Sequence, residues 1–359
     1  MSSIWGKNIR ISIFGESHGA GIGVVIDGLP AGERIDMEEI LFQMSRRAPG
    51  RNNLSTPRKE SDQPEIYSGF LENVTTGAPL CAIIKNNNTH SSDYQNLNQT
   101  PRPGHADYTG RIRYNGFNDY RGGGHFSGRL TAPMVFAGAV CRQILFRRGI
   151  EIGAHIYSIA EICDKPFDTA AVDSNVLNSI VKNKFPVLNH EAGERMCALI
   201  ETARTQGDSV GGVIECAALG FPCGIGSPIF DGVENRLAGI LFGIPAVKGI
   251  EFGAGFESSK LRGSENNDPF YFSGDNVRTK TNRCGGILGG ISTGMPLVFR
   301  LAVKPTPSIF QSQETVDLDT GRDTRLTIKG RHDPCIVIRA LPAVEALTAV
   351  CLLDMLEEC

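Results

Sequence analysis

Segments that combine glycine with Arg, His, Ser or Asp are the part of this sequence best suited to chemistry. They span residues 15–19, 46–51, 102–107, 120–129, 285–290, 304–308 and 330–334. Glycine lets backbone N–H groups approach a ligand closely, and Arg presents forked donors that fit phosphate and carboxylate groups. The combination predicts a binding site for one or two small polyanions.

Single members of this set also have simpler explanations. Arg46 and Arg47, at the end of a predicted helix, complement the helix dipole without any ligand. Isolated histidines such as His90, His155 and His190 are expected to be surface or core residues without a role. The repeated occurrence of Arg or Lys beside Gly or Pro, in non-periodic sequence, is what favours a binding site.

Known motifs narrow the function further. The sequence has no G-x-x-x-x-G-K-S/T loop and no G-x-G-x-x-G fingerprint after a strand, which disfavours P-loop nucleotidases and Rossmann dehydrogenases. Residues 15–19 match the G-x-S-x-G elbow of serine hydrolases, with Ser17 as nucleophile. A helix must follow such an elbow, whereas residues 20–25 are glycine-broken and β-branched, so a serine hydrolase is the weaker alternative.

Composition excludes several other classes. The 359 residues include 36 basic and 39 acidic side chains, and the pI of about 6.2 argues against a nucleic-acid binder. One Arg-Gly-Gly triplet at 121–123 is too little for an RNA-binding module. No apolar run approaches the roughly 20 residues that span a membrane. The ten cysteines form no C-x-x-C pair, so we expect no metal site and a cytoplasmic protein with reduced thiols.

Periodic patterns predict the elements that must position these segments. Alternating or β-branched runs predict strands at 9–14, 21–27, 151–160, 210–219 and 247–252, short strands within 65–84, and glycine-punctuated strands within 285–303. Helical spacing predicts helices from Asp36, which caps the first with Glu39 as partner, and over 130–148, 193–205, 231–242 and 342–358. Helices and strands interleave without a linker, which indicates one α+β domain over residues 1–359.

Nine motifs in order resemble the chorismate synthase family. They are F-G-E-S-H-G at 14–19, R-R-x-P-G at 46–50, R-P-G-H-A-D at 102–107, Y-R-G-G-G at 120–124, G-D-S-V-G-G at 207–212, A-V-K-G-I-E-F-G at 246–253, G-G-I-L-G-G-I-S at 285–292, K-P-T at 304–306 and G-R-H-D-P-C at 330–335. The resemblance extends from end to end of the chain.

The resemblance implies a fold, a reaction and a cofactor. The fold is a β-α-β sandwich, with helices packed between two sheets that have internal pseudo-symmetry, and the usual assembly is a homotetramer. The reaction is the 1,4-anti elimination of phosphate from 5-enolpyruvylshikimate 3-phosphate to give chorismate. It requires reduced FMN without net redox change and is the last common step toward aromatic amino acids in the shikimate pathway. A small-molecule substrate, and neither nucleic acid nor membrane, is therefore the expected partner.

The resemblance also assigns catalytic roles. His18 matches the histidine that protonates the departing phosphate, and His105 matches the histidine beside the flavin N1 region. Ser17, Ser127 and Asp333 match a polar relay that assists proton removal near the flavin N5.

Binding roles follow in the same way. FMN-binding positions are His125, Phe126, Ser127, Gly239, Ile240, Gly289, Lys304, Pro305, Thr306, Pro307, Ser308 and Arg331. Substrate- or NADPH-binding positions are Arg47, Arg51, Arg102 and Arg129. The sequence leaves open whether NADPH is used to reduce the flavin.

Three positions depart from the family pattern. His125 replaces an arginine, Phe126 replaces a serine, and Asn53 replaces a second arginine, although Arg51 is close. A histidine makes the charge at position 125 depend on pH, and ligand affinity would then weaken between about pH 6 and pH 8. The alternative is that His125 turns away and a neighbour such as Arg129 supplies the charge.

Overall fold

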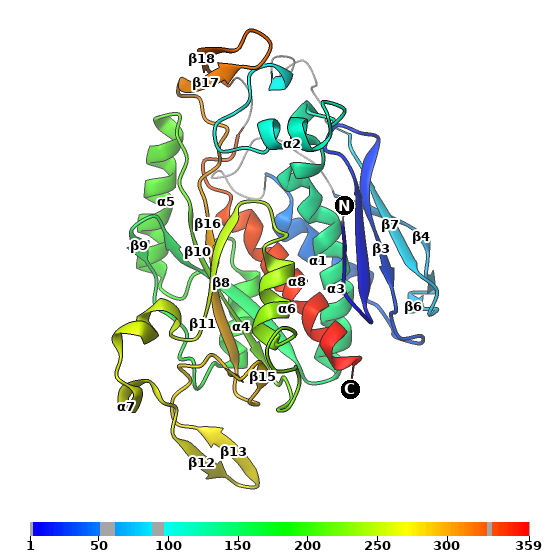
Figure 1. The fold of residues 1–359 in the computed structure, drawn as a ribbon. Coiled ribbons are helices and arrows are strands. Elements are labelled where there is room, and N and C mark those ends of the chain that lie inside the picture. Colours follow the sequence, from blue (N-terminus) through cyan, green and yellow to red (C-terminus); the bar gives the residue numbers. More distant parts are fainter. Residues whose placement is uncertain (1–2, 51–61, 88–96, 329–331, 359) are drawn as a thin grey trace.

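Two antiparallel sheets of five strands face each other across a layer of helices (Figure 1). The computed structural model describes residues 3–50, 62–87, 97–328 and 332–358. The first sheet has the order β1 (Ile4–Trp5), β2 (Arg10–Gly15), β3 (Gly21–Asp27), β7 (Leu80–Lys85) and β4 (Pro64–Ser68). The second has the order β11 (Val247–Phe252), β16 (Leu297–Val303), β10 (Gly212–Leu219), β8 (Glu151–Ile159) and β9 (Ile162–Cys163).

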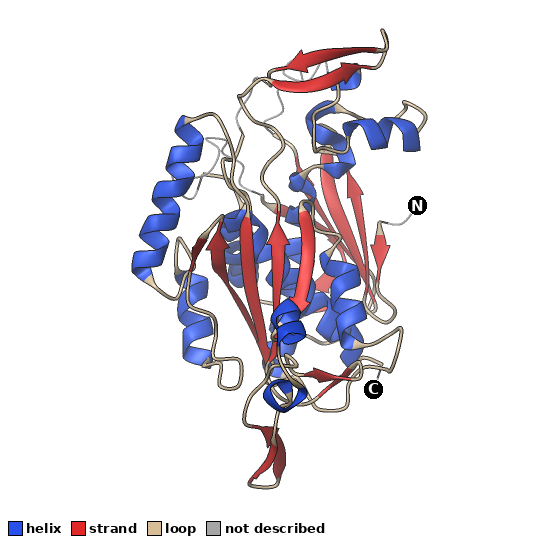
Figure 2. Ribbon diagram, turned by 60° about the vertical axis from the view of Figure 1, so that its left-hand side comes forward, coloured by secondary structure: helices blue, strands red, loops and turns tan. Residues whose placement is uncertain are grey.

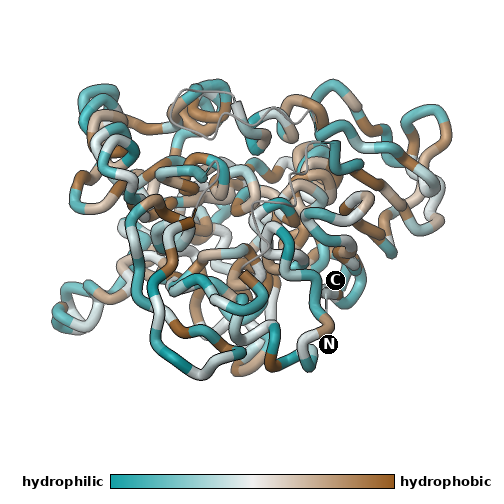
Figure 3. The backbone as a smooth tube through the Cα atoms, turned by 90° about the horizontal axis from the view of Figure 1, so that it is seen from above, coloured by the Kyte–Doolittle hydropathy of each residue, from teal (hydrophilic) through white to brown (hydrophobic). Residues whose placement is uncertain are grey.

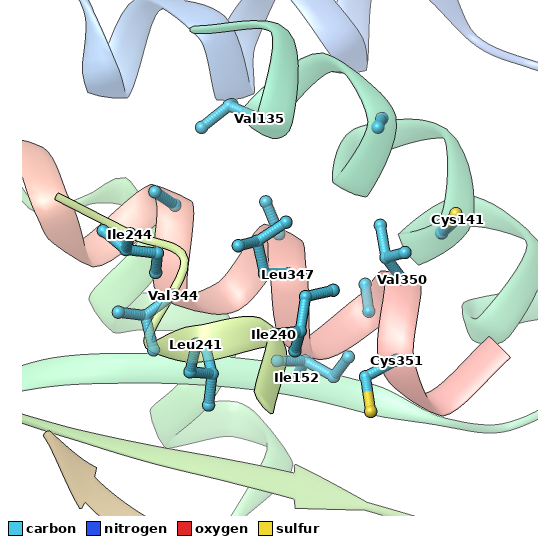
Figure 4. Packing of buried hydrophobic residues seen from close by; sticks show 14 of the residues in the cluster. Val135, Cys141, Ile152, Ile240, Leu241, Ile244, Val344, Leu347, Val350 and Cys351 are labelled. Atoms are coloured by element: carbon cyan, nitrogen blue, oxygen red, sulfur yellow. The ribbon is translucent and has the colours of Figure 1, made fainter. Parts of the chain in front are cut away.

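The middle layer consists of α1 (Met37–Arg47), α3 (Thr131–Arg147), α6 (Val233–Leu241) and α8 (Val337–Leu356). Helices α3 and α8 are apolar on nearly every side, as expected for helices enclosed between two sheets. Figure 4 shows side chains of α3, α6 and α8 meeting in this layer. Each half of the chain contributes one sheet and then one of the two long helices, so the predicted sandwich with its repeated halves is confirmed.

The two sheets differ in how their faces are covered. In the first sheet, inward residues such as Ile11, Ile13 and Val24 are buried and alternate with more exposed ones. The second sheet is buried on both faces, because α4 (Ser174–Lys182) and α5 (His190–Thr205) lie on its outer side (Figure 2). Seen from above, the outer loops are largely hydrophilic (Figure 3).

Short elements complete the chain at its edges. They are β5 (Phe70–Leu71), β6 (Val74–Thr75), α2 (Asp107–Arg113), α7 (Gly263–Asn266), β12 (Phe270–Ser273), β13 (Asn276–Thr279), β14 (Ile287–Leu288), β15 (Ile291–Ser292), β17 (Gln313–Asp317) and β18 (Arg322–Leu326), with 3-10 turns at 121–126, 128–130 and 255–260. Within the described residues, no helix is long and apolar enough to cross a bilayer. The same residues contain no His, Cys, Asp or Glu cluster suited to a metal ion.

The sequence patterns located most of the long elements, with shifted ends. Asp36 caps α1 by accepting from the backbone N–H of Glu38, and this contact takes the place of the predicted box with Glu39. Helix α8 begins at Val337 and contains Pro342 inside its second turn, whereas the pattern predicted a start at the proline. The helices α2 and α4 and the hairpins β12–β13 and β17–β18 were not predicted.

Buried charges fasten the layers together. Glu345 of α8 pairs with Arg46 of α1 and accepts from the backbone N–H of Ala154 in β8 at 2.9 Å. Asp354 accepts three backbone N–H groups at residues 7–9, between 2.7 and 3.0 Å, and so ties the end of α8 to the start of β2. A buried carboxylate that loses its partners is costly, so these pairs also specify how the layers meet.

His155 of β8 is a core residue, as the sequence indicated. Its Nδ1 lies 3.2 Å from Asp164 and its Nε2 lies 2.8 Å from Glu215. Burial alone would lower the pKa of His155, but the two carboxylates outweigh burial and raise that pKa. The histidine therefore belongs to the packing of the second sheet, away from the glycine-rich segments.

Helix α3 packs closely on α8 at Gly138, and this contact predicts a stability effect. A Cβ added at Gly138 would lie 2.2 Å from both Cα and Cβ of Ala346. We expect Gly138→Ala to lower the free energy of unfolding by about 1–3 kcal/mol, as overpacking usually does. Gly239→Ala on α6 is the matched control, because its nearest neighbour would be Trp5 Nε1 at 3.9 Å. Urea unfolding should show that Gly239→Ala is as stable as the wild type or slightly more stable. A Gly138→Ala variant with the wild-type free energy of unfolding would contradict the close packing of α3 on α8.

Candidate active site

Five of the seven glycine-rich segments, all except 15–19 and 285–290, contribute to one cavity of about 530 Å³, a size typical of small-molecule sites. Its walls come from the end of α1, from residues 102–106, 122–131, 242–248 and 304–308, and from the segment that leads into α8. These parts lie far apart in sequence and are brought together where both sheets and the middle layer end at the same side of the molecule.

Two arginines and one carboxylate form the deepest wall. Arg47 donates to Asp62 at 2.5 Å, and Arg129 pairs with the other oxygen of the same carboxylate. Burial alone would raise the pKa of Asp62, but both arginines outweigh it and hold that pKa below its usual value. Burial lowers the pKa of Arg47 to about 10, which still leaves it charged at neutral pH. One negative charge thus faces two positive ones, and the wall attracts anions.

A second arginine–carboxylate unit lies at residues 102–107. Asp107 accepts from Arg102 Nε and Nη2, each at 2.7 Å, and from His105 Nδ1 at 2.6 Å. Arg102 also donates to the hydroxyl of Ser308 at 3.1 Å. Burial, Arg102 and Lys304 together lower the pKa of His105 in spite of Asp107. His105 is therefore mainly neutral at neutral pH, and Arg102 is the permanent cation beside it.

Two lysines provide positive charge at the mouth of the cavity. Lys248 and Lys304 form no ion pair with any residue that the structure describes. Burial and the proximity of Lys248 lower the pKa of Lys304. Nearby, the hydroxyl of Thr306 is buried and has no hydrogen-bond partner among the described residues. Two cations and an available hydroxyl form a suitable end for a phosphate group.

Asp333 and Arg339 lie on the opposite wall. Arg339 Nη1 is 2.5 Å from the Asp333 carboxylate, and its Nε donates to the backbone carbonyl of Arg47 at 3.1 Å. Arg339 thus connects the start of α8 with the end of α1, and it holds an acidic side chain at the edge of an otherwise cationic cavity.

Ser17 and His18 lie behind a wall made of glycine. Gly122 lines the cavity, and a Cβ there would meet His18 Nε2 at 2.5 Å and Ser17 Oγ at 2.8 Å. The Ser17 hydroxyl faces the backbone carbonyls of Gly122 and Arg121 at 3.0 and 3.2 Å. The chain then continues into strand β3 rather than a helix. The nucleophile elbow of a serine hydrolase is therefore not formed.

The comparisons with known proteins agree with this geometry. The family model described as chorismate synthase matches residues 9–356. Chorismate synthases of Dehalococcoides mccartyi and Pyrococcus abyssi are 52% and 47% identical, over 99% and 98% of this chain and 96% of each relative. The chain belongs to the chorismate synthase family. A solved structure titled "Crystal Structure of Chorismate Synthase" superposes with a TM-score of 0.76 at 30% identity, covering 99% of this chain and 93% of the other.

Membership in the chorismate synthase family makes the protein a carbon–oxygen lyase and leaves the hydrolase alternative unsupported. The cavity contains most of the site residues that the family resemblance suggested. The ones that line it are Arg47, Arg102, His105, His125, Phe126, Ser127, Arg129, Lys304, Thr306, Pro307, Ser308 and Asp333. Arg51 and Arg331 lie outside the described residues.

Other expected chorismate synthase contacts are not brought to the cavity. Gly239 and Ile240 lie on α6, where Ile240 is part of the hydrophobic core, and Gly289 lies in the turn between β14 and β15. Pro305 is also absent from the lining, although its neighbours are present. Residues 242–248, which follow α6 and include part of the A-V-K-G motif, line the cavity on this side.

His125, the main departure from the family pattern, has both ring nitrogens engaged. Nδ1 donates to the backbone carbonyl of Gly15 at 2.8 Å, and Nε2 lies 2.8 Å from the hydroxyl of Ser3. The Phe126 ring lies against Tyr114 of the loop after α2, with ring centroids 6.1 Å apart. Because His125 and Arg129 both line the cavity, which of them contacts a bound anion stays a prediction, and ligand titrations of the wild type and of His125→Arg would test it.

The sequence interpretation missed two residues that line the cavity, Lys248 and Arg339, and the buried carboxylate of Asp62 that pairs with Arg47 and Arg129. Asp62 lies outside any motif, and its role appears only when Arg47 and Arg129 meet. Arg339 follows the G-R-H-D-P-C motif by four residues, at the start of a helix that was predicted too late. Lys248 was inside a quoted motif, and its position beside glycine was the signal that could have identified it.

The tight contact at Gly122 gives a prediction for activity. Gly122 has φ +60°, and a Cβ there would lie 2.4 Å from His18 Cδ2. We expect Gly122→Ala to displace His18 and Ser17 and to lower turnover about tenfold or more, because small misplacements of catalytic groups are costly. Gly116→Ala is the control, since it has φ +78° but open space around its Cβ. Steady-state assays should show a large loss of turnover in Gly122→Ala and little loss in Gly116→Ala. Equal losses of turnover in the two variants would mean that backbone strain alone is responsible.

Proposed function

We propose that this protein binds 5-enolpyruvylshikimate 3-phosphate and eliminates its phosphate in a 1,4-anti manner to form chorismate, with reduced FMN held in the same cavity. The observation that supports this best is the convergence of Arg47, Arg102, Arg129, Lys248 and Lys304 on one enclosed space. The substrate carries two carboxylates and a phosphate, and FMN adds another phosphate. Convergent cations stabilise such charges and the leaving phosphate.

The cavity residues fit FMN. The Thr306 hydroxyl, Ser308 and the two lysines offer donors for its phosphate, and Gly122, which lines the cavity without a side chain, leaves room for a flat ring. When bound, reduced FMN supplies near its N5 the proton-accepting site that ordinary side-chain bases lack, without net redox change. Arg47, Arg102 and Arg129 would then hold the substrate anions.

The remaining roles follow the family resemblance. His18 would donate a proton to the departing phosphate. Because His18 lies behind Gly122, this step requires a movement of Gly122 or of the ligand that brings the imidazole and the phosphate together. His105 would interact with the flavin N1 region, and Asp333, Ser17 and Ser127 would assist proton removal near N5. The Ser127 hydroxyl accepts from the backbone N–H of Arg129 at 3.3 Å, which keeps it at the cavity edge.

Three further properties are proposals of the same kind. NADPH is a possible reductant for the flavin, with Arg47 in its binding site. The expected location is the cytoplasm. A homotetramer is supported by exposed apolar side chains on the β12–β13 hairpin, including Phe270, Phe272 and Val277, which fit an interface between copies. Light scattering of the intact protein would test the assembly.

An anaerobic assay tests the reaction itself. With chemically reduced FMN, the protein should release phosphate and form chorismate from the substrate, and the flavin spectrum should change when the substrate is added. No phosphate release under these conditions would refute the proposed function. A second assay with oxidised FMN and NADPH then decides whether the protein reduces its own flavin. An active-serine probe should not label Ser17.

A further inference from the structure

Asp107 is the most heavily bonded acidic side chain next to the cavity, and the proposed reaction assigns it no role. It lies at the first residue of α2, and its side chain is only 3% exposed. Its two oxygens accept from the Arg102 backbone N–H at 3.0 Å, from Arg102 Nε and Nη2, and from His105 Nδ1. Each oxygen of the carboxylate accepts two hydrogen bonds, and all of them come from Arg102 and His105.

The contact with His105 determines which ring nitrogen carries the proton. Arg102 and His105 hold the pKa of Asp107 well below its usual range, although burial alone would raise it. An ionised carboxylate only accepts hydrogen bonds, so the 2.6 Å contact requires a proton on His105 Nδ1. In the neutral ring, Nε2 then carries a lone pair and no proton.

Arg102 lies over the face of the His105 ring. Its Nη2 is 3.0 Å from Nδ1 and 3.3 Å from Nε2, and an in-plane position so close to both nitrogens would overlap Cε1. A guanidinium over the ring disfavours a second proton on it. Asp107 fixes this guanidinium through two parallel hydrogen bonds, the strongest geometry for an arginine–carboxylate pair.

Gly123 lies beside the Cε1–Nε2 edge of the His105 ring. A Cβ added at Gly123 would lie 3.0 Å from Cε1 and 3.1 Å from Nε2, and His105 itself lines the cavity. Because residue 123 is a glycine, no side chain from this position covers the edge that carries the lone pair.

We propose that Asp107 is a positioning residue that fixes His105 as the Nδ1–H tautomer and Arg102 above it, so that the neutral histidine offers a proton acceptor to the cavity. The use of this acceptor by a bound ligand rests on the proposed function. In that setting, His105 would accept a proton or hydrogen bond from a ligand N–H, and only the protonated ring would donate. The tautomer itself is a property of the protein without ligand.

The test is a measurement of the His105 ring in the intact protein. Selective 15N-histidine labelling and two-bond 1H–15N correlation spectra report which nitrogen is protonated, and His105→Gln assigns the signals. We expect Nδ1–H in the wild type above the pKa of His105. In Asp107→Asn the amide can donate to Nδ1, so the ring should shift toward Nε2–H. Turnover should fall about ten- to hundredfold, as for a wrongly oriented acid–base group.

A matched control pairs with the same helix from the turn between β17 and β18. Asp319 pairs with Arg111 of α2 at 3.3 Å in an exposed position, so Asp319→Asn removes a carboxylate–arginine pair without touching His105. It should leave both tautomer and turnover unchanged. Asp107→Glu keeps the negative charge and should retain the Nδ1–H tautomer at least in part.

The outcomes separate the inference from the proposed function. A wild-type ring with Nε2–H, or an Asp107→Asn ring that keeps Nδ1–H, would overturn the positioning role. If Asp107→Asn does not fold, the wild-type spectrum and Asp107→Glu still decide. A wild-type Nδ1–H ring in a protein that forms no chorismate would leave the inference intact and refute the function instead.

Discussion

His105→Ala should lower turnover roughly ten- to ten-thousandfold, the range for the loss of an acid–base or electrostatic partner. His105 lines the cavity and contacts the buried carboxylate of Asp107. Removing it opens the edge beside Gly123 and takes away the proton acceptor there. The fold should survive, because Asp107 keeps its three hydrogen bonds to Arg102. Anaerobic turnover with saturating reduced FMN measures the effect.

His190→Ala is the control for this experiment. His190 begins α5, and its side chain is 91% exposed beside Glu194. Its replacement should change neither turnover nor stability noticeably. Wild-type turnover in His105→Ala would contradict the role given to His105, and an unfolded variant would show that the Arg102–Asp107 pair cannot hold the loop alone.

Asp333→Asn is expected to slow the reaction about a hundred- to ten-thousandfold while FMN and substrate still bind nearly as well. The two side chains are almost equal in shape, so packing is conserved and the lost charge is the variable. Asp333 is held at the cavity by Arg339, and an asparagine can still accept a hydrogen bond from that guanidinium. Flavin titration and single-turnover kinetics separate binding from chemistry.

A second variant distinguishes the carboxylate from its partner. Arg339→Lys keeps a positive charge near Asp333 but loses the contact to the Arg47 carbonyl. It should be less impaired than Asp333→Asn if the carboxylate itself takes part in proton transfer. If Asp333→Asn instead loses FMN affinity and reacts normally at saturating flavin, Asp333 belongs to binding and not to chemistry.

The sequence predicted those parts of the fold whose signals are local. The β-branched run at 21–27 and the helical spacing over 130–148 located β3 and α3 closely, because such patterns act within a few residues. Helix α2 escaped detection because it has seven residues and no side-chain cap. Helix α4 had a capping signal in Asp173, but its apolar face is short.

The site was predictable where a motif carries its own chemistry. Arg102, His105 and Lys304 lie in quoted glycine- or proline-containing motifs, and all three reach the cavity. Asp62 could not be found in this way, since its partner Arg129 lies 67 residues away and nothing local marks the pair. Gly239 and Ile240 were expected from their positions along the family pattern; both lie on α6 and neither lines this cavity, so their contact with FMN stays a prediction.

The central position of α8 has a consequence for how the chain reaches its fold. This helix is the last described element in chain order, yet it lies at the centre of the molecule, where it contacts α3 and the strands β8 and β10. Ile9 bonds to Asp354 across 345 residues, and Arg46 reaches Glu345 across 299. Such a high contact order favours slow folding after synthesis is complete. Until α8 is in place, the face of the second sheet that it contacts at β8 and β10 is uncovered, so nascent chains should depend on chaperones more than a protein of this size with local contacts would.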